Sequence, residues 1–169
     1  MTQEEARKLL IIQPTVNHSA KVNAWASMAE AGPGSLHFIV GNLDALQFVR
    51  ILDEHVKDDG NRLCGSGFFH QQDNDPKHKS RLATKWLTKN KVKTLQWPSN
   101  YPDMSPIENM FHLLKKRVRD RTIRDIVHFK EVFKEEWEAI SKLNTSKFVR
   151  SMPQRLAALG KSKGRHTKY

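Results

Sequence analysis

The chain has 169 residues, a net charge of +11 and an isoelectric point near 9.9. This length fits one domain with a substantial core, and the single cysteine, Cys64, excludes an internal disulfide and a cysteine-based zinc cluster. The sequence shows no run of about 18 apolar residues and no signal peptide at its start. We therefore expect a soluble, intracellular protein without a membrane span.

Basic residues are concentrated in the second half of the chain. Residues 1–75 carry a net charge of −4, residues 76–124 carry +10 and residues 125–169 carry +5. This excess favours a polyanionic partner, although basicity alone does not identify which one. The alternative is that Lys77, Lys79, Lys85 and Lys89 form only a solvated helix face.

The N-terminal third predicts a short helix and then a hairpin. Thr2 and Glu5 fit a capping box for a helix through about Leu10, and a frayed terminus is the equally weighted alternative. Strand-forming residues at 21–28 and 36–40 predict two antiparallel strands. The Ala-Gly-Pro-Gly segment at 31–34 predicts the turn between them.

A helix is predicted over residues 43–57. Asn42 is a suitable N-cap and Gly60 a suitable stop signal. Asp44 lies at the start of this helix and after the hairpin. We therefore interpret Asp44 as a capping residue and not as a catalytic acid.

An acidic residue follows the next predicted strand, at 68–72. Asp73 stands where this strand runs into an Asn74-Asp75 turn, and turn formation is the simplest role for it. Asp75 is suited to cap the following helix, with Pro76 at the first helical position. His70 and His78 flank Asp73; we expect His70 to be packed or hydrogen-bonded, and we assign neither histidine a catalytic role.

Leu82 and Trp86 predict the apolar side of that helix, and residues 92–97 predict another strand. After a proline-containing loop, the Ser-Pro-Ile-Glu segment at 105–108 opens a further helix. The same segment is a capping-box pattern, so Glu108 has a purely structural alternative role. The apolar positions of this helix are Ile107, Met110, Phe111, Leu114 and Val118.

The remainder of the chain predicts helices. An apolar stripe indicates one helix, and residues 148–159 indicate a final helix with Pro153 in its first turn or at a kink. We expect residues 161–169 to be a mobile basic tail, after an N-terminal segment at 1–14 and a single domain at 15–160. The stripe consists of Ile126, Phe129, Phe133, Trp137 and Ile140.

Three segments, QQDNDPKH, WPSNYPDMSPIEN and SMPQRLAAL, resemble the catalytic domain of the Tc/mariner transposases. That family has an RNase H-like fold and a DDE triad of acids, with its second Asp in the QQDN motif and its Glu in the PIEN motif. These positions correspond to Asp73 and Glu108, and 34 residues separate them here, as in the family. The resemblance extends from about Pro14 to the C-terminus.

The resemblance implies an α/β fold in which helices flank a mixed sheet, with a helical C-terminus. It also implies that Asp73 and Glu108 are catalytic acids and ligands of Mg²⁺ or Mn²⁺. The family's first Asp lies on a central strand, but only fourteen residues precede the family-like segment at 15–18, and none is an Asp. We expect that strand and the DNA-binding helix-turn-helix region to be missing, which leaves unpaired inner strand edges. Residues 9–12 are a candidate to fill this gap, but nothing in the sequence demands it.

The chain is therefore interpreted as a transposase remnant that is inactive on its own. Double-stranded DNA is the implied partner, a homodimer the implied assembly and the nucleus the implied location. The alternatives are a non-catalytic nuclear module that binds DNA or a partner protein, and a decayed product without function. The residues predicted to contact DNA are Lys77, Lys79, Lys115, Lys116 and Arg119.

Overall fold

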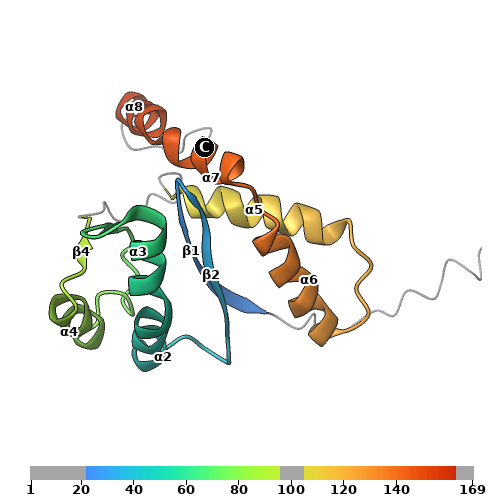
Figure 1. Ribbon diagram of the computed structural model, residues 1–169, viewed down its shortest axis with the longest axis horizontal. Helices are drawn as coiled ribbons and strands as arrows, with labels where there is room; N and C mark the ends of the chain where they lie inside the picture. The colour runs from blue at the N-terminus through green and yellow to red at the C-terminus, as the bar shows by residue number, and fades with distance from the viewer. Residues whose placement is uncertain (1–21, 96–104, 163–169) are drawn as a thin grey trace, which may run out of the picture.

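A β-hairpin lies between two groups of helices in the computed structural model, which describes residues 22–95 and 105–162 (Figure 1). Strand β1 (Asn23–Ala29) pairs antiparallel with β2 (Gly32–Ile39), and Asn23 lies opposite Ile39. The two predicted strands are confirmed, but the second begins four residues earlier than expected. The Gly-Pro-Gly segment continues the strand because Gly34 leaves room for the side chains of Ser27 and Asp59.

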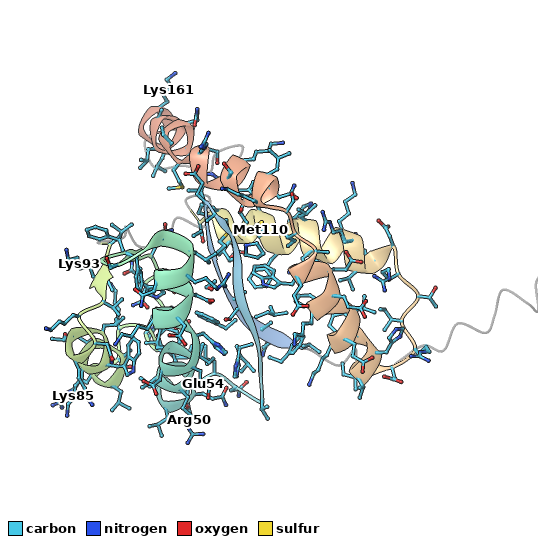
Figure 2. All side chains as sticks on the ribbon, viewed as in Figure 1. Arg50, Glu54, Lys85, Lys93, Met110 and Lys161 are labelled. Carbon is cyan, nitrogen blue, oxygen red and sulfur yellow. The ribbon has the colours of Figure 1, made fainter. Side chains whose placement is uncertain are left out.

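The two faces of the hairpin contribute to two different cores. Alternate side chains of a strand point to opposite faces. Trp25 packs against one buried cluster, which contains Phe48, Leu52 and Trp86. The opposite face packs against a cluster that includes Met110, Leu114 and Trp137; its hairpin residues are Ala24, Ala26, Met28, Leu36 and Phe38. Figure 2 labels Met110 on α5, beside the hairpin.

One continuous helical run covers the Trp25 face. It consists of α2 (Ala45–Ile51), the π-helical turn η1 (Leu52–Val56) and α3 (Lys57–Cys64). Asp44 caps it by accepting a hydrogen bond from the backbone N–H of Gln47, 2.7 Å away, which confirms its capping role in place of Asn42. The predicted stop at Gly60 is wrong. Gly60 lies against the ring of Phe68, where a side chain would not fit, and the run ends at Gly65 with φ of 84°.

Two helices cover the other face, and two more lie at one end of the hairpin (Figure 1). They are α5 (Pro106–Arg119), α6 (Ile126–Glu138), α7 (Lys142–Arg150) and α8 (Met152–Ser162). Of the predicted stripe, Phe133, Trp137 and Ile140 are buried, but Ile126 is 43% exposed because it begins α6 at the rim of the core. The predicted final helix is two helices separated at Ser151, with Pro153 in the first turn of α8.

A small parallel β-α-β unit completes the fold. Strand β3 (Phe69–His70) pairs with β4 (Lys93–Thr94), and α4 (Arg81–Lys89) connects them. The helix does not begin at Pro76 as predicted, because residues 76–79 form a turn and Ser80 caps α4 instead. Trp86 is buried as expected, but Leu82 is 46% exposed.

The sheet is divided in two. The pairs β1-β2 and β3-β4 form separate two-stranded sheets, and within residues 22–95 and 105–162 no strand lies between β1 and β3. The expected unpaired inner edges stay a prediction, because residues 1–21 lie outside the described part of the chain. The predicted N-terminal helix, residues 9–12, part of the 92–97 strand and most of the basic tail lie outside the described residues. None of the described helices is both long and apolar enough to cross a membrane.

Asp59, at the buried face of α3, ties the hairpin to the helical run. Its carboxylate accepts hydrogen bonds from the Ser27 hydroxyl at 2.5 Å, the Ser35 backbone N–H at 2.7 Å and Arg62 at 2.8 Å. Only 5% of the residue is exposed. Burial by itself raises the pKa of Asp59, but these hydrogen bonds outweigh burial and hold the pKa below its usual value.

Replacing Asp59 by Asn is expected to lower the free energy of unfolding by about 2–3 kcal/mol, because three donors lose a charged acceptor that is itself buried. Asp58→Asn changes the exposed neighbouring residue and is expected to have little effect. Since the folded-state pKa is lowered, the contribution of Asp59 is present above the unfolded-state pKa and is lost as the pH falls through the folded-state value. Urea denaturation at neutral pH compares the variants, and equal losses from both would contradict this role.

Candidate active site

A cavity of about 1150 Å³ lies between β1 and the β3 segment. Its lining includes Asp73, which comes three residues after β3, and Glu108, which lies in the first turn of α5. The structure thus brings the two predicted acids to the walls of one cavity, although 34 residues separate them in the sequence. The strand end and the helix start that carry them belong to opposite sides of the divided sheet.

The carboxylate of Asp73 is oriented by its own loop. It accepts a hydrogen bond from the backbone N–H of Asp75 at 3.1 Å, and Nδ1 of His78 lies 2.5 Å from its Oδ1. His78 packs its ring on Phe48, 4.1 Å between centroids, so the imidazole is fixed from behind. This contact between Asp73 and His78 was not predicted, although the two residues lie five positions apart within one motif. The Asp73 side chain remains 69% exposed and accessible to a ligand.

Glu108 is exposed and has no side-chain partner among the described residues. The side chain of Ser105 makes no capping hydrogen bond, and only the backbone N–H of Glu108 bonds to the Ser105 carbonyl. The capping-box alternative for Glu108 is therefore wrong, and its carboxylate is available to bind a ligand.

The neighbour of Glu108 is braced from the C-terminal helix. Arg155 on α8 is only 3% exposed and donates to Oδ1 of Asn109 at 2.5 Å and to the Ser151 hydroxyl at 2.8 Å. This brace connects the SMPQRLAAL and PIEN segments, and the sequence did not reveal it because the two residues are 46 positions apart. It fixes the start of α5 and hence the place of Glu108.

His70 lines the same cavity but does not bind the acids. Burial, reinforced by the nearby His78 and opposed by Gln72, lowers the pKa of His70 to about 4. Its Nε2 atom has no hydrogen-bond partner within the described part of the chain. The expectation of a packed histidine is therefore met, and at neutral pH His70 is uncharged.

Acidification is expected to destabilise the protein through His70 well before it titrates the buried carboxylate of Asp59. The unfolded chain protonates this histidine near pH 6.5 and the folded chain only near pH 4. Above pH 6.5, His70 therefore does not reduce the free energy of unfolding. As the pH falls from 6.5 to about 4, this free energy is expected to fall by about 3 kcal/mol through His70. Urea denaturation between pH 7 and pH 4 should show this loss, and His70→Phe should remove it. A wild-type slope retained in His70→Phe would assign the effect to other groups.

The predicted DNA-contacting residues lie on two elements. Lys115, Lys116 and Arg119 are exposed on α5, and Lys79 is exposed in the turn before α4. Lys77 is instead engaged by Asp75, with Nζ 2.9 Å from the carboxylate. Of the predicted set, Lys79, Lys115, Lys116 and Arg119 are therefore the exposed residues that form no salt bridge with another described residue.

Glu108 shares one exposed face of α5 with two of the predicted DNA-contacting residues. Glu108, His112, Lys115 and Arg119 follow the i, i+4, i+7, i+11 spacing and are all exposed. With a rise of 1.5 Å per residue, Lys115 and Arg119 lie about 10 and 16 Å beyond Glu108 along the axis. An extended polyanion lying on this face would reach the acid pair at one end.

The donor set suits a hard divalent cation. Both acids offer carboxylate oxygens, the ligand type that Mg²⁺ and Mn²⁺ prefer, and Mg²⁺ binds through one or two carboxylates plus water and substrate phosphates. His78 orients Asp73, as residues behind a ligand commonly do in metal sites. The residues present therefore fit one such ion.

The sequence profile of the DDE superfamily endonucleases matches residues 7–130. The chain belongs to this family. The matched part contains Asp73 and Glu108, so both predicted acids lie within the segment that this chain shares with the family. The resemblance to the Tc/mariner transposases is confirmed by the relatives of this DDE chain.

Two nematode transposases are among those relatives. The chain is 32% identical over 157 residues to the Tcb1 transposase of Caenorhabditis briggsae and 33% identical over 158 residues to the Tc1 transposase of Caenorhabditis elegans. Each match covers 92% of this chain and 58% of the relative. The DDE chain thus spans little more than half the length of these curated relatives.

Solved structures confirm the RNase H-like α/β fold. The Mos1 transposase catalytic domain in complex with raltegravir and Mg superposes with a TM-score of 0.77 at 14% identity, covering 87% of this chain and 77% of that one. The Mos1 strand transfer complex gives a TM-score of 0.76 at 14% identity, covering 94% and 49%. At this identity the likeness concerns the fold of the DDE chain.

Proposed function

We propose that this chain is the catalytic-domain part of a metal-dependent DNA transposase, in which Asp73 and Glu108 are acidic ligands of Mg²⁺ or Mn²⁺. The observation that carries the proposal is that both carboxylates line one cavity, one oriented by His78 and the other without a partner among the described residues. The family membership and the Mos1 catalytic-domain structures with Mg and with Mn support this choice of ion.

Divalent ions held at such acids supply the activation of the attacking oxygen and the neutralisation of the leaving oxygen in phosphodiester chemistry. In this chain Asp73 and Glu108 each contribute a carboxylate, and His78 keeps Asp73 in place. Two carboxylates suffice to hold one ion, whereas a pair of ions needs a bridging acid. The other acids that line the cavity, Glu30, Asp59 and Asp75, are engaged by Arg150, Arg62 and Lys77. We therefore propose that the chain alone binds metal but does not cleave DNA, and that cleavage needs a further, bridging carboxylate in the cavity.

Double-stranded DNA is the proposed substrate, with a homodimer as the assembly and the nucleus as the location. The exposed basic face of α5 supports the choice of DNA as the substrate, because Lys115 and Arg119 continue along the helix from Glu108. The Mos1 relatives of known structure are described as a paired-end complex with a transposon end and as a strand transfer complex. The alternative proposal is a non-catalytic module that binds DNA through the same basic residues.

The double substitution Lys115→Ala, Arg119→Ala is expected to weaken binding to duplex DNA at least about tenfold. It should reduce the slope of log Kd against log salt by about 2, because two phosphate contacts are lost. Lys134→Ala is the matched control, since Lys134 is exposed on α6 and pairs with Glu138 at 3.8 Å. Fluorescence anisotropy measures both quantities, and an equal loss in the control would mean that only net charge matters.

Metal-enhanced DNA binding tests the proposed function against the non-catalytic alternative. An ion held by the acid pair is expected to bridge to a phosphate, so millimolar Mn²⁺ should tighten DNA binding by the wild-type chain. This increase should be absent in Asp73→Asn and Glu108→Gln. A wild-type affinity that Mn²⁺ does not raise would favour a non-catalytic module and overturn the metal role.

A further inference from the structure

Three potential metal ligands lie together on the Trp25 face of the hairpin, and none of them lines the cavity that contains Asp73 and Glu108. His37 is on β2, and Glu54 and His55 are consecutive residues of η1. One ligand atom from each lies within 4.8 Å of the other two, the only such group of three found in residues 22–95 and 105–162. Figure 2 labels Glu54 on the helical run beside the hairpin.

The distances match one face of a tetrahedral coordination site. Nδ1 of His37 lies 3.1 Å from Nε2 of His55, and Oε2 of Glu54 lies 3.8 Å and 3.7 Å from these two nitrogens. Ligands that bind zinc at about 2.0–2.1 Å in a tetrahedron are about 3.3–3.5 Å apart. Shifts of a few tenths of an ångström would therefore bring all three atoms into position.

The two imidazoles are partly buried, whereas the carboxylate is more exposed to solvent. The ring of His55 stacks on Trp25 at 5.8 Å with an interplanar angle of 17°. The side chains of His37 and His55 are 31% and 22% exposed, whereas that of Glu54 is 56% exposed. An ion can thus enter from solvent, and water is available as a fourth ligand.

The backbone under this cluster is unusual. Residues 52–56 form the π-helical turn in the middle of an otherwise α-helical run. Such turns are rare and occur frequently at functional sites. The turn also contains the only two consecutive residues of the cluster, so its geometry sets how Glu54 and His55 both reach His37.

We propose that His37, Glu54 and His55 form a binding site for a transition-metal ion of the zinc class, which links β2 to η1. Two imidazoles and one carboxylate select zinc or cobalt over Mg²⁺, which prefers oxygen ligands. Nδ1 of His37 and Nε2 of His55 lie within hydrogen-bond distance of each other, and an ion bound to both nitrogens would replace that hydrogen bond. The site is separate from the acid pair in both location and ligand type.

Titration of the full chain with Co²⁺ and Zn²⁺ tests the proposal. Saturable binding of one Co²⁺ ion per chain is expected, with visible absorption typical of four-coordinate cobalt, and one equivalent of Zn²⁺ should displace it. A tenfold or greater excess of Mg²⁺ should not displace the Co²⁺ ion. Binding of Zn²⁺ should also raise the midpoint of thermal unfolding, since the ion links two elements of the folded state.

Variants decide which residues bind the ion. His37→Gln and Glu54→Gln are each expected to weaken Zn²⁺ binding at least about tenfold, whereas Asp73→Asn should leave it unchanged. His112→Gln is the matched control, because His112 is exposed on α5 and lies outside the cluster. Glu54 is the most exposed of the three residues, so its variant should stay folded even if His37→Gln does not. Unchanged affinity in Glu54→Gln and His37→Gln, or no saturable binding by the wild type, would overturn the site.

Discussion

Asp73→Asn and Glu108→Gln are each expected to weaken Mn²⁺ binding at the cavity by at least about tenfold, and the double variant should abolish it. Of the five acids that line this cavity, Asp73 and Glu108 are the two without a Lys or Arg partner among the described residues, because Glu30, Asp59 and Asp75 pair with Arg150, Arg62 and Lys77. Losing residues that merely orient a metal ligand typically costs 10–100-fold in affinity, so the loss of a ligand should cost at least as much. Titration of Mn²⁺ followed by electron paramagnetic resonance measures the free ion and hence the affinity.

The matched control for this prediction is Asp75→Asn. Asp75 lines the same cavity and lies two residues from Asp73, but its carboxylate pairs with Lys77. The variant should therefore keep most of the Mn²⁺ affinity. His78→Ala is expected to give an intermediate loss, because it leaves both carboxylates in place and removes only the contact that orients Asp73. If Asp75→Asn lost as much affinity as Asp73→Asn, the ion would be held by the negative charge of the loop as a whole.

Trp137→Ala is expected to lower the free energy of unfolding by about 3–5 kcal/mol. Trp137 on α6 is 1% exposed, lies 6.0 Å from the ring of Phe111 and donates from Nε1 to the Gly34 carbonyl at 2.9 Å. Trp137 thus joins the hairpin to α5, the helix that carries Glu108. Its removal leaves a cavity between these elements. Urea denaturation at neutral pH measures the loss.

Two further variants separate the contributions of Trp137. Trp137→Phe keeps most of the ring packing but leaves the Gly34 carbonyl without its donor, so a loss of about 1–2 kcal/mol is expected. Val127→Ala, at a position on the same helix that is 62% exposed, should change stability by less than about 0.5 kcal/mol. Equal losses from all three variants would mean that α6 contributes through helix propensity and not through this core.

Local patterns in the sequence predicted most helices, whereas the acid pair was predicted from the resemblance to the Tc/mariner family. The QQDN and PIEN segments and their spacing identified Asp73 and Glu108, and the structure places both on one cavity. Caps were less certain because several residues near a helix start have suitable side chains. Asp44 and Ser80 act as caps by accepting hydrogen bonds from the backbone N–H groups of Gln47 and Ala83, although Asn42 and Asp75 were also suitable.

Features that depend on distant contacts were not predictable from local patterns. Gly60 reads as a helix stop, yet the helix continues because the Phe68 ring occupies the space beside it. The brace from Arg155 to Asn109 and the cluster of His37 with His55 connect residues far apart in the chain. Neither pair of residues belongs to a periodic pattern or a single sequence motif, so their contacts could be found only in the folded structure.

Anomalous diffraction from crystals of the chain grown with MnCl₂ tests most directly whether Asp73 and Glu108 hold one ion together. If the two acids hold one ion, an anomalous difference peak is expected in the cavity, with a carboxylate oxygen of each residue within about 2.0–2.2 Å of it. The peak should disappear in crystals of Glu108→Gln. A map with no peak between the two carboxylates, or with manganese only at His37, Glu54 and His55, would contradict the proposed metal centre.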